Sequence, residues 1–208
     1  MKKITLILLF ISPLLINAQN INLKKWAKND DPKKIGLLVS NRFVESPHNS
    51  FRPPTPPKSI TYPEVCAWYG ALKFAKITKN KSLLNQLNNR FEYLINDEKQ
   101  LIPKPAHVDN TVFGSIPFEL FMQTKEQNYL NLGLQFADAQ WKIPENVSPE
   151  KEKAYKALLQ KNLTWQTRFW IDDMFMITMV QTQAYRATED RKYINRTAYE
   201  MYVYLDTL

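Results

Sequence analysis

The fold is decided by the junction Thr188-Glu-Asp-Arg-Lys-Tyr-Ile194, which separates two segments with the apolar periodicity of helices. Two similar junctions occur earlier in the chain, Thr78-Lys-Asn-Lys-Ser-Leu-Leu84 and Thr124-Lys-Glu-Gln-Asn-Tyr-Leu130. Each has a threonine, a few polar or charged residues and then a new apolar run, as a short turn between two helices requires. We therefore interpret the three stretches as copies of one helical hairpin.

The segments around these junctions predict an all-α fold. Apolar residues recur in them at intervals of three and four, and the four glycines and clustered prolines leave the periodic segments uninterrupted. A further helix is predicted at 31–42, because Asp31-Pro32 is a helix start signal. The predicted hairpin helices are 62–77 with 82–95, 116–122 with 129–141, and 174–187 with 193–208.

The spacing between the junctions indicates how the hairpins are arranged. The threonines are 46 and 64 residues apart, whereas tetratricopeptide arrays repeat at about 34 residues. Long insertions at 96–110 and 142–169 follow the second helix of one hairpin and precede the next. Hairpins of this kind form an (α/α) toroid whose long loops build a cleft at one end, so we expect function at the starts of the inner helices. Asp109 and Asp172 stand at such starts.

The N-terminal region predicts export. Residues 1–18 have a short positive start, an apolar run and a small residue before a polar segment, which is typical of a secretory signal peptide. We expect the mature protein to be periplasmic or secreted, with no membrane anchor after signal removal. Residues 19–61 then contain the first helix and an extended Pro-rich connector, and 62–208 form the hairpin domain. The single cysteine, Cys66, lies in an apolar run and is interpreted as a packed core thiol.

Composition narrows the classes of partner. The formal net charge is +8, but the basic residues are spread along the chain without a stripe or motif for nucleic acid. At most, this charge would attract an anionic substrate or polymer. Two histidines and one cysteine provide no cluster with metal-ligand spacing, so no metal is predicted.

The candidate site is the stretch 164–176, where the pair Asp172-Asp173 follows aromatic residues and an arginine. An aromatic wall beside a carboxylate suits a sugar, whose ring has an apolar face to stack on and hydroxyls to orient. The alternative is structural: Asp172 as a helix N-cap and Asp173 as a favourable charge in the first turn.

The segment Trp170-Ile-Asp-Asp-Met-Phe-Met176 resembles the Trp-x-Asp-x-Leu/Met-Tyr/Phe-Met signature of glycoside hydrolase families 88 and 105, the unsaturated glucuronyl and rhamnogalacturonyl hydrolases. His107-Val-Asp-Asn-Thr111 is similar to an earlier acidic segment of those enzymes, and the junction at Thr188 resembles their hairpin turn. The resemblance covers roughly residues 62–208. It implies an (α/α)6 barrel without metal or cofactor, acting on unsaturated uronic-acid oligosaccharides left by polysaccharide lyases.

The resemblance also implies residue roles. Asp172 would be the general acid/base that protonates C4 and activates water toward C5 of the unsaturated ring, and Asp109 would be the second acidic residue of the cleft. Ordinary glycosidases instead use two carboxylates at the anomeric carbon. We expect burial beneath Phe169 and Trp170 to favour the protonated Asp172 carboxyl.

Five further residues are candidates for substrate binding. Structural alternatives stay open: Arg168 as a counter-ion of the aspartates, the tryptophans as core residues and Asp173 as a cap. The candidates are Trp170, Arg168, His107, Trp165 and Asp173.

The length leads to a further expectation. Six hairpins would need roughly 300 residues at this spacing, and the chain has 208 and stops within a predicted helix. We expect a fragment that builds part of the barrel and is inactive if the missing hairpins complete the site. Two other functions remain open, another (α/α)-barrel glycosidase or lyase and a non-catalytic helical-repeat binding protein. The oligosaccharide used and the oligomeric state are not predicted.

Overall fold

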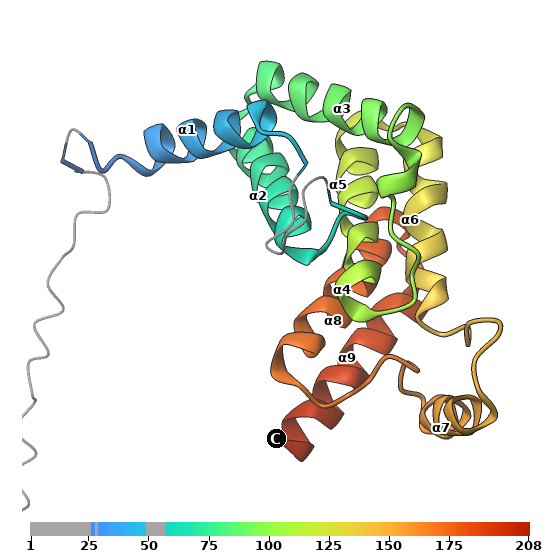
Figure 1. Ribbon diagram of the computed structural model, residues 1–208. Helices are drawn as coiled ribbons and strands as arrows, with labels where there is room; N and C mark the ends of the chain where they lie inside the picture. The colour runs from blue at the N-terminus through green and yellow to red at the C-terminus, as the bar shows by residue number, and fades with distance from the viewer. Residues whose placement is uncertain (1–25, 28, 49–56) are drawn as a thin grey trace, which may run out of the picture.

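The computed structural model describes residues 26–27, 29–48 and 57–208, and within those residues it contains helices and no strand (Figure 1). The prediction of an all-α fold is therefore confirmed. The predicted signal peptide and residues 51–56 of the Pro-rich connector lie outside the described residues. No helix in the described ranges is both long and apolar enough to span a membrane.

Helices occur at all the predicted hairpin positions. The α-helices are α1 Pro32–Glu45, α2 Tyr62–Thr78, α3 Lys81–Asn96, α4 Val108–Thr111, α5 Ser115–Thr124, α6 Gln127–Ala139, α7 Pro149–Gln160, α8 Ile171–Thr188 and α9 Arg191–Thr207, with short 3-10 turns at η1 Lys99–Leu101 and η2 Val112–Gly114.

The three junctions share one backbone geometry. The first helix of each hairpin ends in a left-handed residue, namely Lys79 at φ 56°, Lys125 at φ 69° and Glu189 at φ 62°. The threonine before each turns its hydroxyl back to the carbonyl four residues earlier, at 2.7 Å for Thr78, 3.0 Å for Thr124 and 2.7 Å for Thr188. A left-handed cap satisfies carbonyls at the end of a helix and reverses the chain. The similar sequences at the junctions thus make the same turn.

The first helices of the hairpins pack side by side, with α5 against both α2 and α8. Each second helix lies against its own first helix, α3 on α2, α6 on α5 and α9 on α8, while α1 packs on α2 and α3 (Figure 1). This is the inner and outer helix arrangement of an (α/α) toroid. From the sequence, long loops are expected at one end of such a ring. At that end α4 packs against α8.

Aromatic side chains connect the first two hairpins in the core. Phe91 lies 5.6 Å from the ring centroid of Trp68, 6.0 Å from Phe113 and 5.4 Å from Tyr129. All four rings are fully buried. Edge-to-face and offset contacts at these distances add to the stabilisation from burial. The helix α6 approaches α5 closely because Gly133 has no side chain: a Cβ there would lie 2.8 Å from the ring of Phe118.

A buried carboxylate connects α5 to α8. Glu119 is fully buried and accepts hydrogen bonds from the amides of Gln123 at 3.1 Å and Gln183 at 3.0 Å. Arg186 of α8 also donates to it, at 3.3 Å. A buried charge is costly unless it is paired and hydrogen-bonded, so these contacts make Glu119 a structural group.

Two expectations from the sequence are wrong. The insertion 142–169 is not all loop, because it contains α7, a helix in which no residue is buried. Cys66 is not a packed core thiol: it is exposed on α2 and lines a small hollow of about 120 Å³ between α2, η2 and α8.

Candidate active site

The candidate site is built on a buried segment, 163–167, that runs between α7 and α8. The hydroxyl of Thr164 donates to the carbonyl of Gln140 beyond the end of α6, and the indole N–H of Trp165 donates to the carbonyl of Ala139 at 2.8 Å. The ring of Trp165 lies 4.9 Å from that of Tyr155 on α7. These contacts fix the segment to α6 and α7, so it serves as a rigid base for the exposed residues that follow.

A carboxyl group from α9 stabilises the same segment through hydrogen bonds. Glu200 is fully buried and accepts hydrogen bonds from the backbone N–H of Thr164 at 3.2 Å and from the hydroxyl of Thr167. Burial raises the pKa of Glu200 to about 7, although both hydrogen bonds act in the opposite direction. The sequence analysis did not single out Glu200, because 36 residues separate it from Thr164.

An amide joins the two acidic segments. Gln166 donates to the hydroxyl of Thr111 at 2.7 Å and to the carbonyl of Pro105 at 3.4 Å. Thr111 ends α4, the short helix that carries Asp109 in its first turn. Gln166 therefore holds the segment before α8 against the segment that contains Asp109.

The last residues before α8 turn sharply outward. Phe169 has φ 59°, a left-handed conformation that is unfavourable for a bulky side chain, and its ring lies 5.2 Å from that of Tyr204. Trp170, the N-cap of α8, is 61% exposed. Strained backbone of this kind persists only where the surrounding structure determines it. Here the turn exposes the ring of Trp170 beside the first turn of α8.

Arg168 is the electrostatic centre of the site. Its Nε and Nη2 donate to the two carboxylate oxygens of Asp173 at 2.8 Å and 2.6 Å, and its guanidinium lies 4.8 Å from the centroid of the Trp170 ring. Hydrogen bonding to Asp173 is the largest cause that raises the pKa of Arg168, and the negative charges of Asp109 and Asp172 raise it further. Asp173 therefore binds the guanidinium directly, and Asp109 and Asp172 act on it only through their charges.

The two catalytic candidates differ in their surroundings. Asp172 lies exposed in the first turn of α8, and Asp109 lies half-buried in the first turn of α4. His107 is the N-cap of α4: its Nδ1 accepts from the backbone N–H of Asp109 at 3.3 Å and lies 3.5 Å from the Asp109 carboxylate. The helices α4 and α8 pack together, so both carboxylates lie at the same end of the inner helices.

The structure buries two of the substrate-binding candidates. Trp165 is only 5% exposed, with its ring against Tyr155 and its N–H bonded, so its position is that of a core residue. Asp173 is fully buried and paired with Arg168, so it holds the arginine in place. The expected burial of Asp172 beneath Phe169 and Trp170 is wrong, because Asp172 and Trp170 are both exposed.

Apolar side chains extend the site along α8. Phe175 is half exposed and follows Asp172 by three residues, which places it on the same side of the helix. Together with Tyr69 and Met179 it lines the 120 Å³ hollow beside α2. An exposed carboxylate next to an exposed aromatic surface can present a proton to a sugar ring that stacks on that surface.

A family model described as Glycosyl Hydrolase Family 88 matches residues 39–207, which is more than half of the chain. The chain belongs to Glycosyl Hydrolase Family 88. Comparison with curated proteins and with solved structures found no match. The match covers α2 to α9, and therefore all seven candidate site residues.

Membership of Glycosyl Hydrolase Family 88 makes the chain a glycoside hydrolase, with a carbohydrate as its substrate. The (α/α) arrangement of hairpins agrees with that family. Among the residues that the structure describes, no three His, Cys, Asp or Glu side chains come together as a possible metal site.

Proposed function

We propose that this family 88 chain removes unsaturated uronic acid from oligosaccharides by hydrating the C4=C5 double bond. The observation that supports the proposal best is the arrangement around Arg168, where Asp172 and Asp109 are held near one guanidinium beside the exposed Trp170. The pair of Arg168 with the buried Asp173 fixes the guanidinium, because both carboxylate oxygens are used.

In the proposed reaction Asp172 is the acid and then the base. Its carboxyl donates a proton to C4, and the resulting carboxylate accepts a proton from the water whose oxygen attacks C5. The product carries a hydroxyl on C5, a hemiketal that opens by breaking the bond between C5 and the ring oxygen. The ring oxygen then remains as a hydroxyl on C1, and this hemiacetal releases the neighbouring sugar. Atoms balance with one water consumed.

The exposed position of Asp172 sets a condition on this mechanism. The acid has to carry a proton when the substrate is bound. A uronate stacked on Trp170 would cover Asp172, and desolvation favours the neutral carboxyl. Arg168 has five N–H donors and uses two of them on Asp173. The remaining N–H groups would face the carboxylate of the uronate.

Asp109 and His107 have supporting roles in the proposal. The Asp109 carboxylate lies next to His107 and near Arg168. Its negative charge would disfavour ionisation of Asp172 and so help to keep the proton on the acid. His107 holds the first turn of α4, which carries Asp109. We also propose that the chain is exported, because residues 1–18 have the pattern typical of a secretory signal peptide.

The test is loss of the ultraviolet absorbance of the C4=C5 carboxylate conjugate in lyase-digested rhamnogalacturonan and glycosaminoglycan. Wild type is expected to remove the absorbance, and Asp172→Asn to reduce the rate by about 10²-fold or more, since general acid–base groups contribute 10²–10⁴-fold. Asp206→Asn is the matched control, because Asp206 is an exposed aspartate on α9. Equal rates for the two variants would refute the role of Asp172. Unchanged absorbance on every substrate, both with this chain and with a version extended to the stop codon of its gene, would refute the proposed reaction.

A further inference from the structure

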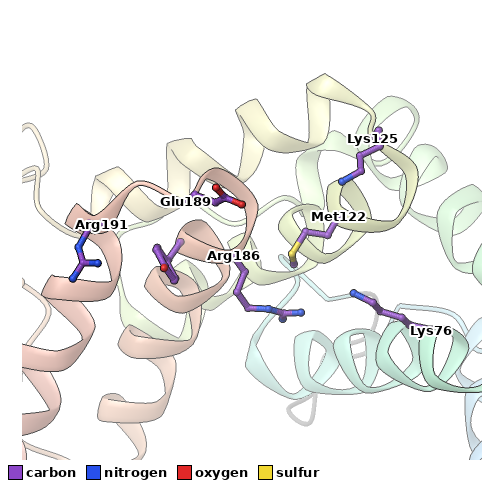
Figure 2. Close-up of a pocket in the computed structure, with 7 residues that line it drawn as sticks. Lys76, Met122, Lys125, Arg186, Glu189 and Arg191 are labelled. Atoms are coloured by element: carbon purple, nitrogen blue, oxygen red, sulfur yellow. The ribbon is translucent and has the colours of Figure 1, made fainter.

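The end of the hairpins opposite Asp172 carries an open pocket of about 660 Å³, where the C-terminal ends of α2, α5 and α8 meet (Figure 2). Four of its lining residues are cations: Lys76, Lys125, Arg186 and Arg191. Met122, Tyr185 and Glu189 complete the lining. This pocket has no residue in common with the candidate active site.

Two positive side chains from different helices approach each other in the pocket. Figure 2 shows Lys76 of α2 and Arg186 of α8 extending toward each other, with Lys125 at the end of α5 beside Met122. Like charges that approach one another repel, and the cost is offset when an anion lies between them. The arrangement is therefore complementary to a negatively charged ligand.

The carboxylates near the pocket do not balance these charges. Arg186 donates to the buried Glu119 at 3.3 Å, and the Lys76 amine lies 3.9 Å from the same carboxylate. Glu119 also accepts from two amides, so its charge is shared among several donors. With Glu189 there are two carboxylates against four cations. The pocket keeps a positive excess.

A structural role accounts for only part of this pattern. Cations near helix C-termini interact favourably with the helix dipole, and Lys76 and Arg186 each lie in the last turn of a helix. That role requires each cation only beside its own helix end. Glu119, which both Lys76 and Arg186 contact, also accounts for the approach of these two side chains. Neither role pairs Lys125 or Arg191 with a carboxylate among the described residues, and both line the same pocket.

We infer that this pocket binds a tetrahedral oxyanion, a phosphate or sulfate group, either free or as an ester on a sugar. Arg186 offers a planar set of N–H donors, and the lysines offer mobile point charges. Met122 and Tyr185 provide an apolar wall for a ring that carries the group. The inference does not depend on the proposed hydration reaction, because it uses a separate set of residues.

The test is titration of the protein with inorganic sulfate, with chloride added to keep the ionic strength constant. Binding is measured by calorimetry and by the change in the melting temperature. We expect saturable binding with a dissociation constant on the order of 1 mM, a range suited to a small ion held by few groups. The melting temperature should rise with sulfate, because a ligand that binds only the folded state stabilises it.

The test variant is Lys76→Gln with Lys125→Gln, which removes two cations and leaves the Arg186–Glu119 pair intact. It should lose about tenfold or more in sulfate affinity, since charge-assisted contacts are the strong ones. The matched control is Lys151→Gln with Lys153→Gln, two exposed lysines of α7. It removes the same charge and should bind sulfate as wild type does. Circular dichroism should show native helix content in both variants.

The other outcomes separate the sources of the ligand and refute the inference. A sulfated monosaccharide that binds more tightly than inorganic sulfate identifies a sugar ester as the ligand, and the reverse order identifies the free anion. Non-saturable binding in wild type, or equal loss of affinity in both double variants, would overturn the proposal. The proposal would also be overturned if the Lys76→Gln, Lys125→Gln variant had a lower melting temperature in chloride alone but the same rise with sulfate as wild type. The two lysines would then only stabilise the ends of their helices.

Discussion

The two ends of the inner helices are built in different ways. At the C-terminal ends the same turn occurs three times, and each threonine hydroxyl bonds a carbonyl four residues away. At the N-terminal end of α8 the contacts connect residues far apart in the sequence, from 24 positions for Thr164 and Gln140 to 61 for Gln166 and Pro105. The repeated end makes the hairpins, and the irregular end positions Asp172.

This difference indicates which end of the inner helices tolerates substitutions. A local turn depends on few residues and can be replaced by another sequence with the same backbone preference. The end that carries Asp172 depends on side chains that connect separate elements. Trp165 contacts both α6 and α7, and Glu200 of α9 binds the segment before α8. Substitutions there are expected to cost more free energy than substitutions at the junctions.

The largest effect is expected for Trp165→Ala. This change removes a buried ring together with its contact with Tyr155 and its hydrogen bond to Ala139. The free energy of unfolding should fall by about 3–5 kcal/mol, as in other truncations of large buried aromatics, in a urea denaturation experiment. Trp170→Ala is the matched control, because that ring is 61% exposed, and it should cost less than about 1 kcal/mol. Similar losses for both would contradict the buried base.

The next effect is a dependence of stability on pH through Glu200. Its pKa is about 7 in the folded protein, above the ordinary value of 4.5, so the folded state binds the proton more tightly than the unfolded state. The contribution of Glu200 to stability is therefore greatest below pH 4.5, falls as the pH rises to about 7 and is constant above that. The total change is on the order of 3 kcal/mol.

The variant Glu200→Gln tests this dependence. Glutamine keeps an oxygen that accepts from Thr164 or Thr167 but does not ionise. Urea denaturation between pH 4.5 and 8 should show a clear loss of stability in wild type, and the loss should be smaller in Glu200→Gln by the contribution of this one group. Parallel curves for the two proteins would show that Glu200 is not desolvated in the folded state.

A smaller effect is expected for the pair of Arg168 and Asp173. Arg168→Met leaves the fully buried Asp173 without its partner, which costs about 2 kcal/mol after allowance for the partial exposure of the arginine. Arg168→Met combined with Asp173→Asn should be more stable than Arg168→Met alone, because the buried charge is then gone. A double variant that is less stable than the single variant would contradict the role of Arg168 as counter-ion.

The smallest effect is a gain of stability at a junction. Glu189 has φ 62°, which glycine adopts without strain. Glu189→Gly should raise the free energy of unfolding by about 0.5–1 kcal/mol. Glu145→Gly, at an exposed turn residue whose φ is not positive, relieves no strain and should lower stability slightly. Lower stability in both variants would show that the left-handed caps carry no strain.

The same difference between the two ends explains what the sequence predicted. The hairpins were predictable because the turn at Thr188 and its counterparts lies within seven consecutive residues and occurs three times. The position of Asp172 at the N-terminal end of α8 was predictable from the apolar run that follows it, although α8 begins at Ile171, three residues before the predicted start. Local signals were sufficient for both.

The parts that were not predicted depend on non-local contacts or weak local signals. The sequence offers nothing that distinguishes the exposed Asp172 from the buried Asp173. Their difference in burial arises from packing and from the two hydrogen bonds that the Arg168 guanidinium donates to Asp173. Glu200 and Gln166 act on residues from 33 to 61 positions away. The helix α7 had one usable signal, Ser148-Pro149, whose serine caps the helix through the N–H of Lys151 at 3.4 Å.

The most direct measurement is proton NMR of the reaction in D₂O with an unsaturated uronic-acid disaccharide. If Asp172 hydrates the double bond, the vinyl proton signal at C4 should disappear as deuterium enters C4, and the neighbouring sugar should be released only with or after this step. Asp172→Asn should show neither change, while Asp206→Asn behaves as wild type. Release of the neighbouring sugar with the C4=C5 bond still intact would contradict hydration and indicate attack at the anomeric carbon.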